Sequence, residues 1–263
     1  MKNTFHDYQI ELYSFDAEIF VDSYSYNVEY KIIVWFAMLV MYRCGSFATF
    51  YALSLDFIQF PLYNQVLYYL VLLASDIVLL VYAYVFSYAY ERMKSFTLFV
   101  KKDDVDIVSC HYLYKNLAEM VEKVKKSFDL VLILTLLANT TDAILHVYYP
   151  FADKAPLPNT LKETFYAIVA YAVVAQQLLI LFFPAFTAGL LADQVEKLRL
   201  ALYDRLIKDN SNAKDLKRFV GYVDGRPLRF RVWCVVPLDW RLPVIVINIS
   251  ITYIIVMIQF MRK

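Results

Sequence analysis

The sequence is poor in glycine and cysteine, with four and three residues respectively in a chain of 263. So few glycines argue against glycine-rich phosphate-binding loops and against collagen-like or low-complexity chains. Cys44, Cys110 and Cys234 are too few for a disulfide-dense secreted scaffold and too widely spaced for a CxxC metal motif. The formal net charge is only +1, which gives no general basic field for nucleic acid. We therefore expect no metal, no cofactor and no nucleic-acid partner.

Catalytic motifs are also missing. The sequence contains no HExxH, no GxSxG and no Walker loop, and its three histidines, His6, His111 and His146, are isolated from one another. Cys110 and His111 are adjacent, but a cysteine nucleophile needs a base that approaches it in space, and the sequence identifies none. These observations predict a protein that is not an enzyme.

Apolar and aromatic residues, by contrast, are abundant. Residues of the AVILMFWYC set make up 60% of the chain and charged residues 19%, with 23 Tyr and 20 Phe. Ordinary soluble domains are roughly 45–50% apolar and about 25% charged. A membrane-spanning helix needs about 20 mostly apolar residues. The sequence predicts an all-α, polytopic membrane helical bundle with five such spans, at residues 32–55, 62–90, 128–151, 164–192 and 243–261.

Basic residues predict how these spans are oriented. The segment 91–127 holds eight Lys and Arg and the segment 193–241 holds eleven, whereas 56–61 has none. Basic loops remain cytoplasmic, which places the N-terminus inside and the C-terminus outside. Residues 1–31 are rich in acidic side chains and lack the apolar stretch of a signal peptide, so we interpret them as a cytoplasmic lead-in. The membrane region would then occupy residues 32–263.

The two basic segments look like helical continuations of the spans. Apolar residues recur in steps of three and four along 91–127 and 193–240, which predicts amphipathic helices packed into a cytoplasmic bundle. Residues 208–214 are interpreted as a loop and 221–227, with the sequence GYVDGRP, as a turn. The apolar positions of the two faces are Leu113, Leu117, Met120, Val124 and Phe128, then Leu191, Val195, Leu198, Leu202 and Leu206.

Ionisable residues inside predicted spans are candidates for function. Arg43 and Asp76 lie in the first and second spans, which are hairpin neighbours, and the favoured interpretation is a structural ion pair rather than ion conduction. Asp142 and His146 are four residues apart and so share one helix face. For them we favour interhelical hydrogen bonding over a ligand or proton-transfer role.

The last span carries a polar stripe. At about 100° per residue, Asn248, Thr252, Ile255 and Gln259 fall within an arc of roughly 60°. Such a stripe either bonds to a neighbouring helix or faces water, and periodicity favours the neighbour. Beside a symmetry axis it would instead line a pore, with an amide ring at Gln259 and apolar Ile255 and Phe260 able to close it by dewetting.

The stripe also resembles a known signature. Thr252, Tyr253, Gln259 and Phe260 match TYhhhhhQF, where h is hydrophobic, the motif that closes the last helix of insect gustatory receptors. The resemblance extends over about residues 30–263. It implies a seven-helix receptor in the plasma membrane, with a cytoplasmic N-terminus, assembling as a tetramer into a tastant-gated, non-selective cation channel. Gln259 and Phe260 would lie at the gate. Because five spans remain of seven, the resemblance implies a chain truncated at its N-terminus.

A ligand pocket is implied within each helical bundle, opening outward. Candidate lining residues, chosen by position alone, are Tyr148, Tyr149, Tyr166, Tyr171 and Gln176. The expected partners are a small tastant, the lipid bilayer and other receptor subunits of the same or another kind. The alternatives are an insect odorant receptor and, from another class, a structural or transport membrane protein whose polar stripe packs against its own helices.

Overall fold

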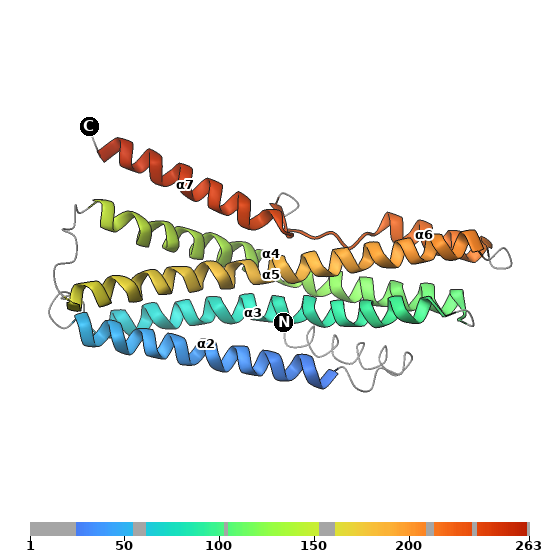
Figure 1. The fold of residues 1–263 in the computed structure, drawn as a ribbon, viewed down its shortest axis with the longest axis horizontal. Helices are drawn as coiled ribbons and strands as arrows, with labels where there is room; N and C mark the ends of the chain where they lie inside the picture. The colour runs from blue at the N-terminus through green and yellow to red at the C-terminus, as the bar shows by residue number, and fades with distance from the viewer. Residues whose placement is uncertain are drawn as a thin grey trace. The chain divides into compact units, whose positions relative to one another are not determined.

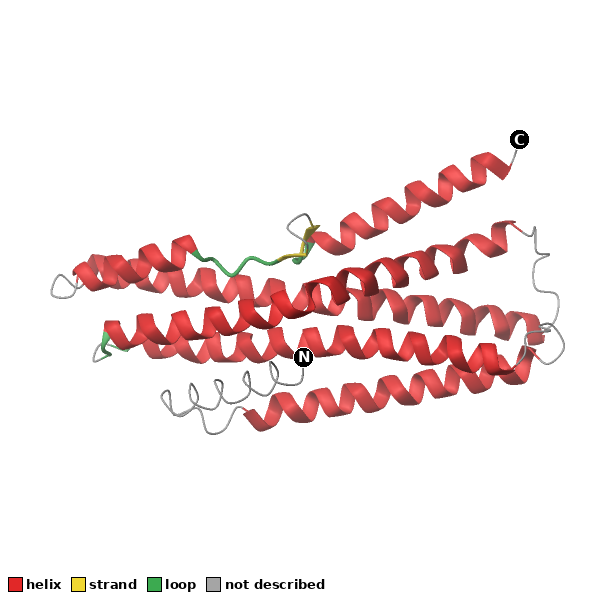
Figure 2. Cartoon of the chain, turned by 180° about the vertical axis from the view of Figure 1, so that it is seen from behind, coloured by secondary structure: helices red, strands yellow, loops and turns green. Residues whose placement is uncertain are grey.

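Long helices make up most of this computed structural model, which describes residues 25–54, 62–102, 105–152, 161–208, 213–232 and 236–261 (Figure 1). The helices are α2 (Ser25–Ser54), α3 (Leu62–Val100), α4 (Ile107–Ala152), α5 (Leu161–Lys208), α6 (Ala213–Gly225) and α7 (Arg241–Met261). Two two-residue strands, β1 (Arg231–Val232) and β2 (Val236–Pro237), pair antiparallel just before α7 (Figure 2). The predicted all-α class is confirmed, with this small ladder as a local addition. The predicted lead-in lies largely outside the described residues.

The predicted continuity of spans and basic helices is also confirmed. Helices α3, α4 and α5 each run without a break through residues assigned to a span and residues assigned to a basic segment. The chain divides into two compact units, and each of these three helices contributes to both. Among the described residues, unit 1 contains 25–30, Tyr82–Leu130 and Ala185–Trp240, and unit 2 contains Lys31–Val81, Val131–Pro184 and Arg241 onward.

Unit 1 has a dense apolar core. Phe219 of α6 is fully buried and its ring lies 6.4 Å from that of Phe96 and 5.9 Å from that of Tyr114. The predicted inward faces of α4 and α5 are buried here, which confirms the amphipathic pattern. Burial of such a face supplies most of the stability of a helix in a protein. The buried members of the two faces are Leu113, Leu117, Met120, Val124, Leu191, Val195, Leu198 and Leu202.

The connection between α3 and α4 is held by side chains that satisfy free backbone groups. Arg205 donates from Nη1 to the carbonyl oxygens of Val100 and Lys102, at 2.9 and 3.0 Å. A cation at the C-terminus of a helix also suits the helix dipole. Asp106 precedes α4 and accepts hydrogen bonds from the Ser109 hydroxyl and from the backbone N–H groups of Val108 and Ser109, which lower the pKa of its carboxyl. It is therefore the N-cap of α4.

One local prediction was wrong. The stretch 221–227 was expected to be a turn, but α6 continues through Gly221 to Gly225. The reason is tertiary packing: Leu216, Phe219, Val220 and Val223 bury one side of α6, and this burial outweighs the cost of about 1 kcal/mol for a glycine inside a helix. The predicted loop at 208–214 is narrower in the structure, because α5 ends at Lys208 and α6 begins at Ala213.

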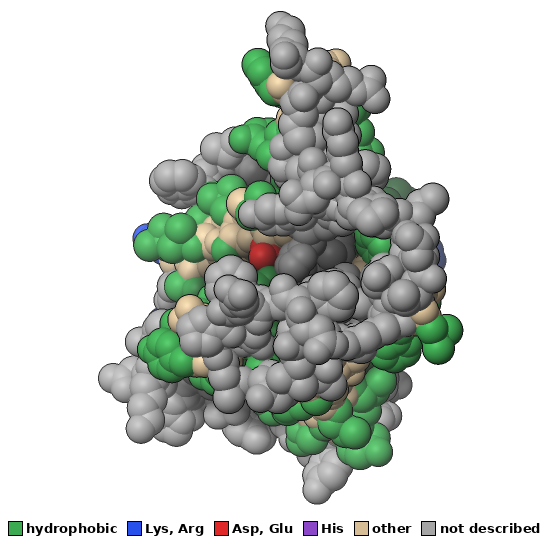
Figure 3. Space-filling view, turned by 90° about the vertical axis from the view of Figure 1, so that its left-hand side faces the viewer, with side chains coloured by type: hydrophobic (Ala, Val, Ile, Leu, Met, Phe, Trp, Pro, Cys, Tyr) green, Lys and Arg blue, Asp and Glu red, His purple; other side chains and the backbone are tan. Residues whose placement is uncertain are grey.

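Unit 2 exposes its apolar side chains instead of burying them. Along α2, Ile33 is 65% exposed, Met38 57% and Met41 74%. An end-on space-filling view shows hydrophobic side chains around the rim and few charged ones among the described residues (Figure 3). In the part of the chain that the structure describes, two helices are long and apolar enough to cross a membrane, Val66–Val100 and Leu178–Lys208, and two shorter apolar helices are Ile33–Thr49 and Arg241–Met257. This surface is suited to lipid rather than to water.

Candidate functional site

The polar stripe of α7 is exposed along its whole length. Asn248, Thr252 and Gln259 are all exposed, as are the apolar Ile255 (49%) and Phe260 (74%). The Thr252 hydroxyl donates to the carbonyl oxygen of Asn248 at 2.8 Å, so this polar group is satisfied within the helix itself. The structure thus presents all five predicted pore residues at the surface of the chain.

The side of α7 that the chain itself covers lies opposite this stripe. Taking Asn248 as zero and 100° per residue, the stripe lies at about −20 to 40°, while the main half-buried positions lie at about 160 to 240°. Ile245, near the start of the helix, is the half-buried exception. Ser250 belongs to the covered side, and its hydroxyl donates to the carbonyl oxygen of Val246 at 2.8 Å. The half-buried positions of that side are Pro243, Val246, Ser250, Ile254 and Met257.

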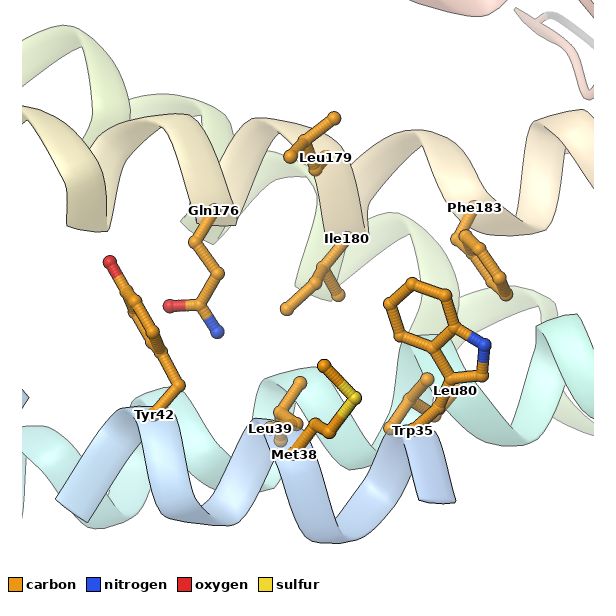
Figure 4. A pocket seen from close by; sticks show the side chains of 9 residues that line it. All are labelled: Trp35, Met38, Leu39, Tyr42, Leu80, Gln176, Leu179, Ile180 and Phe183. Carbon is orange, nitrogen blue, oxygen red and sulfur yellow. The ribbon is translucent and has the colours of Figure 1, made fainter. Parts of the chain in front are cut away.

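A pocket of about 280 Å³ lies within unit 2, between α2, α3 and α5 (Figure 4). At one end the ring of Trp35 meets that of Phe183, with centroids 5.7 Å apart. Tyr42 and Gln176 lie at the other end (Figure 4). The lining is almost entirely apolar, which is usual for small-molecule sites. Its members are Trp35, Met38, Leu39, Tyr42, Leu80, Gln176, Leu179, Ile180 and Phe183.

Of the two predicted pocket residues whose side chains the structure describes, Gln176 lines this pocket and Tyr171 does not. Tyr171 is 54% exposed. The side chains of Tyr148, Tyr149 and Tyr166 lie outside the described residues, so their assignment stays a prediction. The lining residues of α2 and α5 recur at spacings of three and four, but these spans are apolar on both sides, so the spacing does not separate them from residues that face lipid.

The predicted ion pair in unit 2 is confirmed. Arg43 Nε lies 2.6 Å from the Asp76 carboxylate, with the side chains 3% and 1% exposed. In a buried pair of this kind the attraction between the charges at low dielectric is offset by the cost of removing them from water. The net contribution to stability is therefore small, whereas removing one partner strongly destabilises the protein. The Nη1 and Nη2 atoms of Arg43 are buried and have no hydrogen-bond partner in the described structure. The pair thus leaves donors of a charged group unused.

Further polar contacts join α3 to α4 in unit 2. The Tyr68 hydroxyl lies 3.0 Å from both carboxylate oxygens of Asp142. The Asn139 amide donates to the Ser75 hydroxyl at 2.5 Å and to the carbonyl oxygen of Thr135. Asp142 therefore makes the interhelical bond expected of it, whereas the side chain of His146 lies outside the described residues. Hydrogen bonds of this kind between apolar helices help to hold the helices together in a membrane.

Unit 1 offers no reactive centre in its described part. Cys110 is fully buried, and burial raises the pKa of its thiol to about 12, so it is protonated at neutral pH and a poor nucleophile. His111 stacks on Phe219 with ring centroids 5.4 Å apart, and desolvation, with the charges of Arg218 and Lys115, lowers its pKa. Among the described residues no group of His, Cys, Asp and Glu is arranged to hold a metal ion.

Long helices with an exposed apolar surface indicate a membrane protein, and the comparison with known families supplies its class. The model of the 7tm chemosensory receptor family matches residues 5–261, so the chain belongs to that family. The chain is therefore a chemoreceptor embedded in a membrane. A search of curated proteins finds no match.

Proposed function

We propose that this protein is a gustatory receptor, a subunit of a tastant-gated, non-selective cation channel that assembles as a tetramer around α7. The observation that carries the proposal is the direction of the polar stripe. Asn248, Thr252 and Gln259 point away from the side of α7 that the chain covers. A stripe packed against the protein's own helices, as in a structural or transport protein, would be covered.

The physical argument concerns the cost of polar groups in lipid. Moving an amide from water into hydrocarbon without a hydrogen-bond partner costs roughly 2–7 kcal/mol of free energy, depending on the reference state. The side chains of Asn248 and Gln259 are exposed on a very apolar helix, so they need water or a neighbouring subunit. A central water-filled pore supplies both. Ile255 and Phe260 would then be the apolar constriction that closes it.

The proposed topology rests on charge. Five spans, at about 32–55, 62–90, 128–151, 164–192 and 243–261, cross the plasma membrane with the N-terminus inside and the C-terminus outside. The basic segments 91–127 and 193–240 belong almost wholly to unit 1, whose packed core suits an aqueous compartment. Unit 1 would then be the cytoplasmic anchor that holds the subunits together. The buried, protonated Cys110 is consistent with a receptor that performs no catalysis.

The proposal is tested by recording tastant-evoked cation current from cells that express an active receptor. Gln259→Ala removes the amide of the stripe and is expected to change permeation or gating. Ser250→Ala is the matched control, because Ser250 lies on the covered side and its hydroxyl bonds within its own helix. If Gln259→Ala conducts and gates like the unmodified receptor, the pore assignment is wrong.

A further inference from the structure

The pocket of unit 2 ends at the buried ion pair. Leu39 and Leu80 line the pocket, and Arg43 and Asp76 lie four residues from them on α2 and α3, respectively. Residues four apart lie on the same face of a helix, one turn or about 5.4 Å along it. Arg43 donates a hydrogen bond to Asp76, so this pair bridges α2 and α3, the same two helices that carry the two leucines. The pair therefore adjoins the end of the pocket near Tyr42 (Figure 4).

This end of the pocket holds hydrogen-bonding capacity that the chain leaves unused. The side chain of Arg43 is only 3% exposed, and neither Nη1 nor Nη2 has a hydrogen-bond partner in the described structure. Gln176, at the same end, has a buried Oε1 that likewise accepts no bond there. Buried polar groups are almost always satisfied, and an unsatisfied charged donor is the most costly exception. An oxygen atom brought between them would find strong donors.

The local charge decides which oxygen fits. Asp76 already neutralises Arg43 at 2.6 Å, so a second carboxylate would meet a like charge in a low-dielectric site. A carbonyl or hydroxyl oxygen accepts from the guanidinium without that repulsion. Such an oxygen can also stand beside the apolar walls contributed by Met38 and Leu179.

We infer that this pocket binds an uncharged, mainly apolar molecule carrying one carbonyl or hydroxyl oxygen, to which Arg43 donates from its free Nη groups. An apolar cavity of about 150 Å³ holds benzene, so a pocket of about 280 Å³ suits a molecule of about eleven non-hydrogen atoms. As the ligand of a receptor the molecule would be the tastant, and in that role the inference rests on the proposed function. The binding itself is measurable without any current.

The test compares three compounds of nearly equal size on the purified protein in detergent by calorimetry. Tetralone carries a ring carbonyl, tetralin is its parent hydrocarbon, and naphthoate carries a carboxylate. A hydrogen bond to a charged group is worth roughly tenfold or more in affinity, so tetralone should bind about tenfold more tightly than the other two. Equal affinities for tetralone and tetralin, or a preference for naphthoate, would overturn the inference. So would no binding at all, as expected if lipid or detergent chains fill the pocket.

Replacing the pair by apolar residues isolates Arg43. Arg43→Met combined with Asp76→Leu removes both charges together, an exchange that is often neutral for stability. The double variant should bind tetralone only as well as tetralin, with tetralin binding unchanged. Arg199→Met, in unit 1, is the control and should keep the preference. A double variant that retains the tenfold preference, or one that elutes like the unmodified protein yet binds neither compound, contradicts a direct bond from Arg43.

The two proposals fail separately. If tetralone binds with the expected dependence on Arg43 but evokes no current in any receptor assembly, the pocket stands and the channel proposal is weakened. If Gln259→Ala alters current while tetralone and tetralin bind equally, the channel proposal stands and the polar end of the pocket is refuted.

Discussion

Units 1 and 2 are built partly from the same three helices, yet unit 1 buries most of its large apolar side chains and unit 2 exposes most of its own. In unit 1, Phe96, Phe219 and Leu191 are fully inaccessible. Most exposed large hydrophobics belong to unit 2. Among the side chains that the structure describes, six buried apolar ones lie in unit 2, namely Leu39, Leu72, Leu79, Leu132, Leu136 and Leu242. The same helices thus run through both units, while the placement of their apolar side chains differs in the way expected for surroundings of water and of lipid.

Charged groups follow the same division. In unit 1 the buried Arg92 rests on the ring of Tyr88, with its guanidinium carbon 3.3 Å from the centroid, and most charged side chains remain at the surface. In unit 2 the buried charges form a pair whose partners come from different helices, Arg43 and Asp76. A protein surface in lipid cannot solvate a lone charge, so pairing is required there. Each of the following predictions separates the two units.

The largest effect is expected from truncating a side chain in the core of unit 1. Phe219→Ala should lower the free energy of unfolding by about 3–5 kcal/mol, because it removes a fully buried ring and leaves a cavity. Phe260 in α7 is 74% exposed, so Phe260→Ala should change the free energy of unfolding of the single chain by less than about 0.5 kcal/mol. Denaturant unfolding of the purified protein measures both. Equal losses would show that the two units are packed alike.

Breaking the buried pair of unit 2 should rank next. Arg43→Met leaves Asp76 buried without its partner and is expected to cost about 3–5 kcal/mol, toward the lower end if the carboxyl takes up a proton. Adding Asp76→Leu should restore most of that loss. Lys115→Ala in unit 1 breaks an exposed pair with Glu119 and should cost at most about 1 kcal/mol. Thermal unfolding in detergent distinguishes the three, and a single variant as stable as the double would refute the pair's role.

Two glycine variants probe packing within unit 1. A Cβ on Gly189 would lie 2.6 Å from the indole nitrogen of Trp240, so Gly189→Ala should destabilise by about 1–3 kcal/mol as the ring is displaced just before α7. Gly221 lies in α6 with open space around it, and Gly221→Ala should stabilise by about 0.4–1 kcal/mol. The opposite signs are the prediction. Stabilisation by both variants would mean that Trp240 does not rest against α5.

The smallest effect is expected from acidification. Desolvation, then the neighbouring Arg218 and Lys115, hold the pKa of His111 below its ordinary value of 6.5. His111 in the unfolded chain therefore binds a proton more readily than in the folded chain. The free energy of unfolding should be highest above pH 6.5 and should decline as the pH falls from 6.5 toward the lower pKa of the folded state. His111 is only partly buried, which keeps the effect modest. His111→Gln should flatten the pH dependence of unit 1 unfolding, and an unchanged slope would contradict this assignment.

The sequence predicted the helices better than the site. Spacing along α4 and α5 correctly indicated the buried faces at Leu117 and Leu198, because amphipathic periodicity records which side meets a core. The same approach failed at Gly221, where packing of α6 outweighs a glycine's preference for turns. Local composition cannot register such long-range contacts.

Pocket residues were harder to predict for a different reason. In a lipid-facing helix both sides are apolar, so the residues that line the pocket, such as Met38 and Leu179, look no different from those that face lipid. Tyrosines near the expected outer surface were chosen instead, and among those whose side chains are described Tyr171 is not in the lining. Arg43 and Asp76 were identified because a charge inside an apolar span is conspicuous, and their pairing followed from hairpin geometry.

The central claim is that the polar stripe of α7 faces a water-filled path shared between subunits. Single cysteines at Thr252 and Gln259, in a background with Cys44, Cys110 and Cys234 replaced, should react with a charged, water-soluble thiol reagent applied to the membrane-embedded receptor. Cysteines at Ile247 and Ile249, about a quarter to a third of a turn from the stripe on either side, should react far more slowly. Modification at Thr252→Cys and Gln259→Cys that also blocks the current is the predicted result. Equal protection of all four positions would contradict a pore along this stripe.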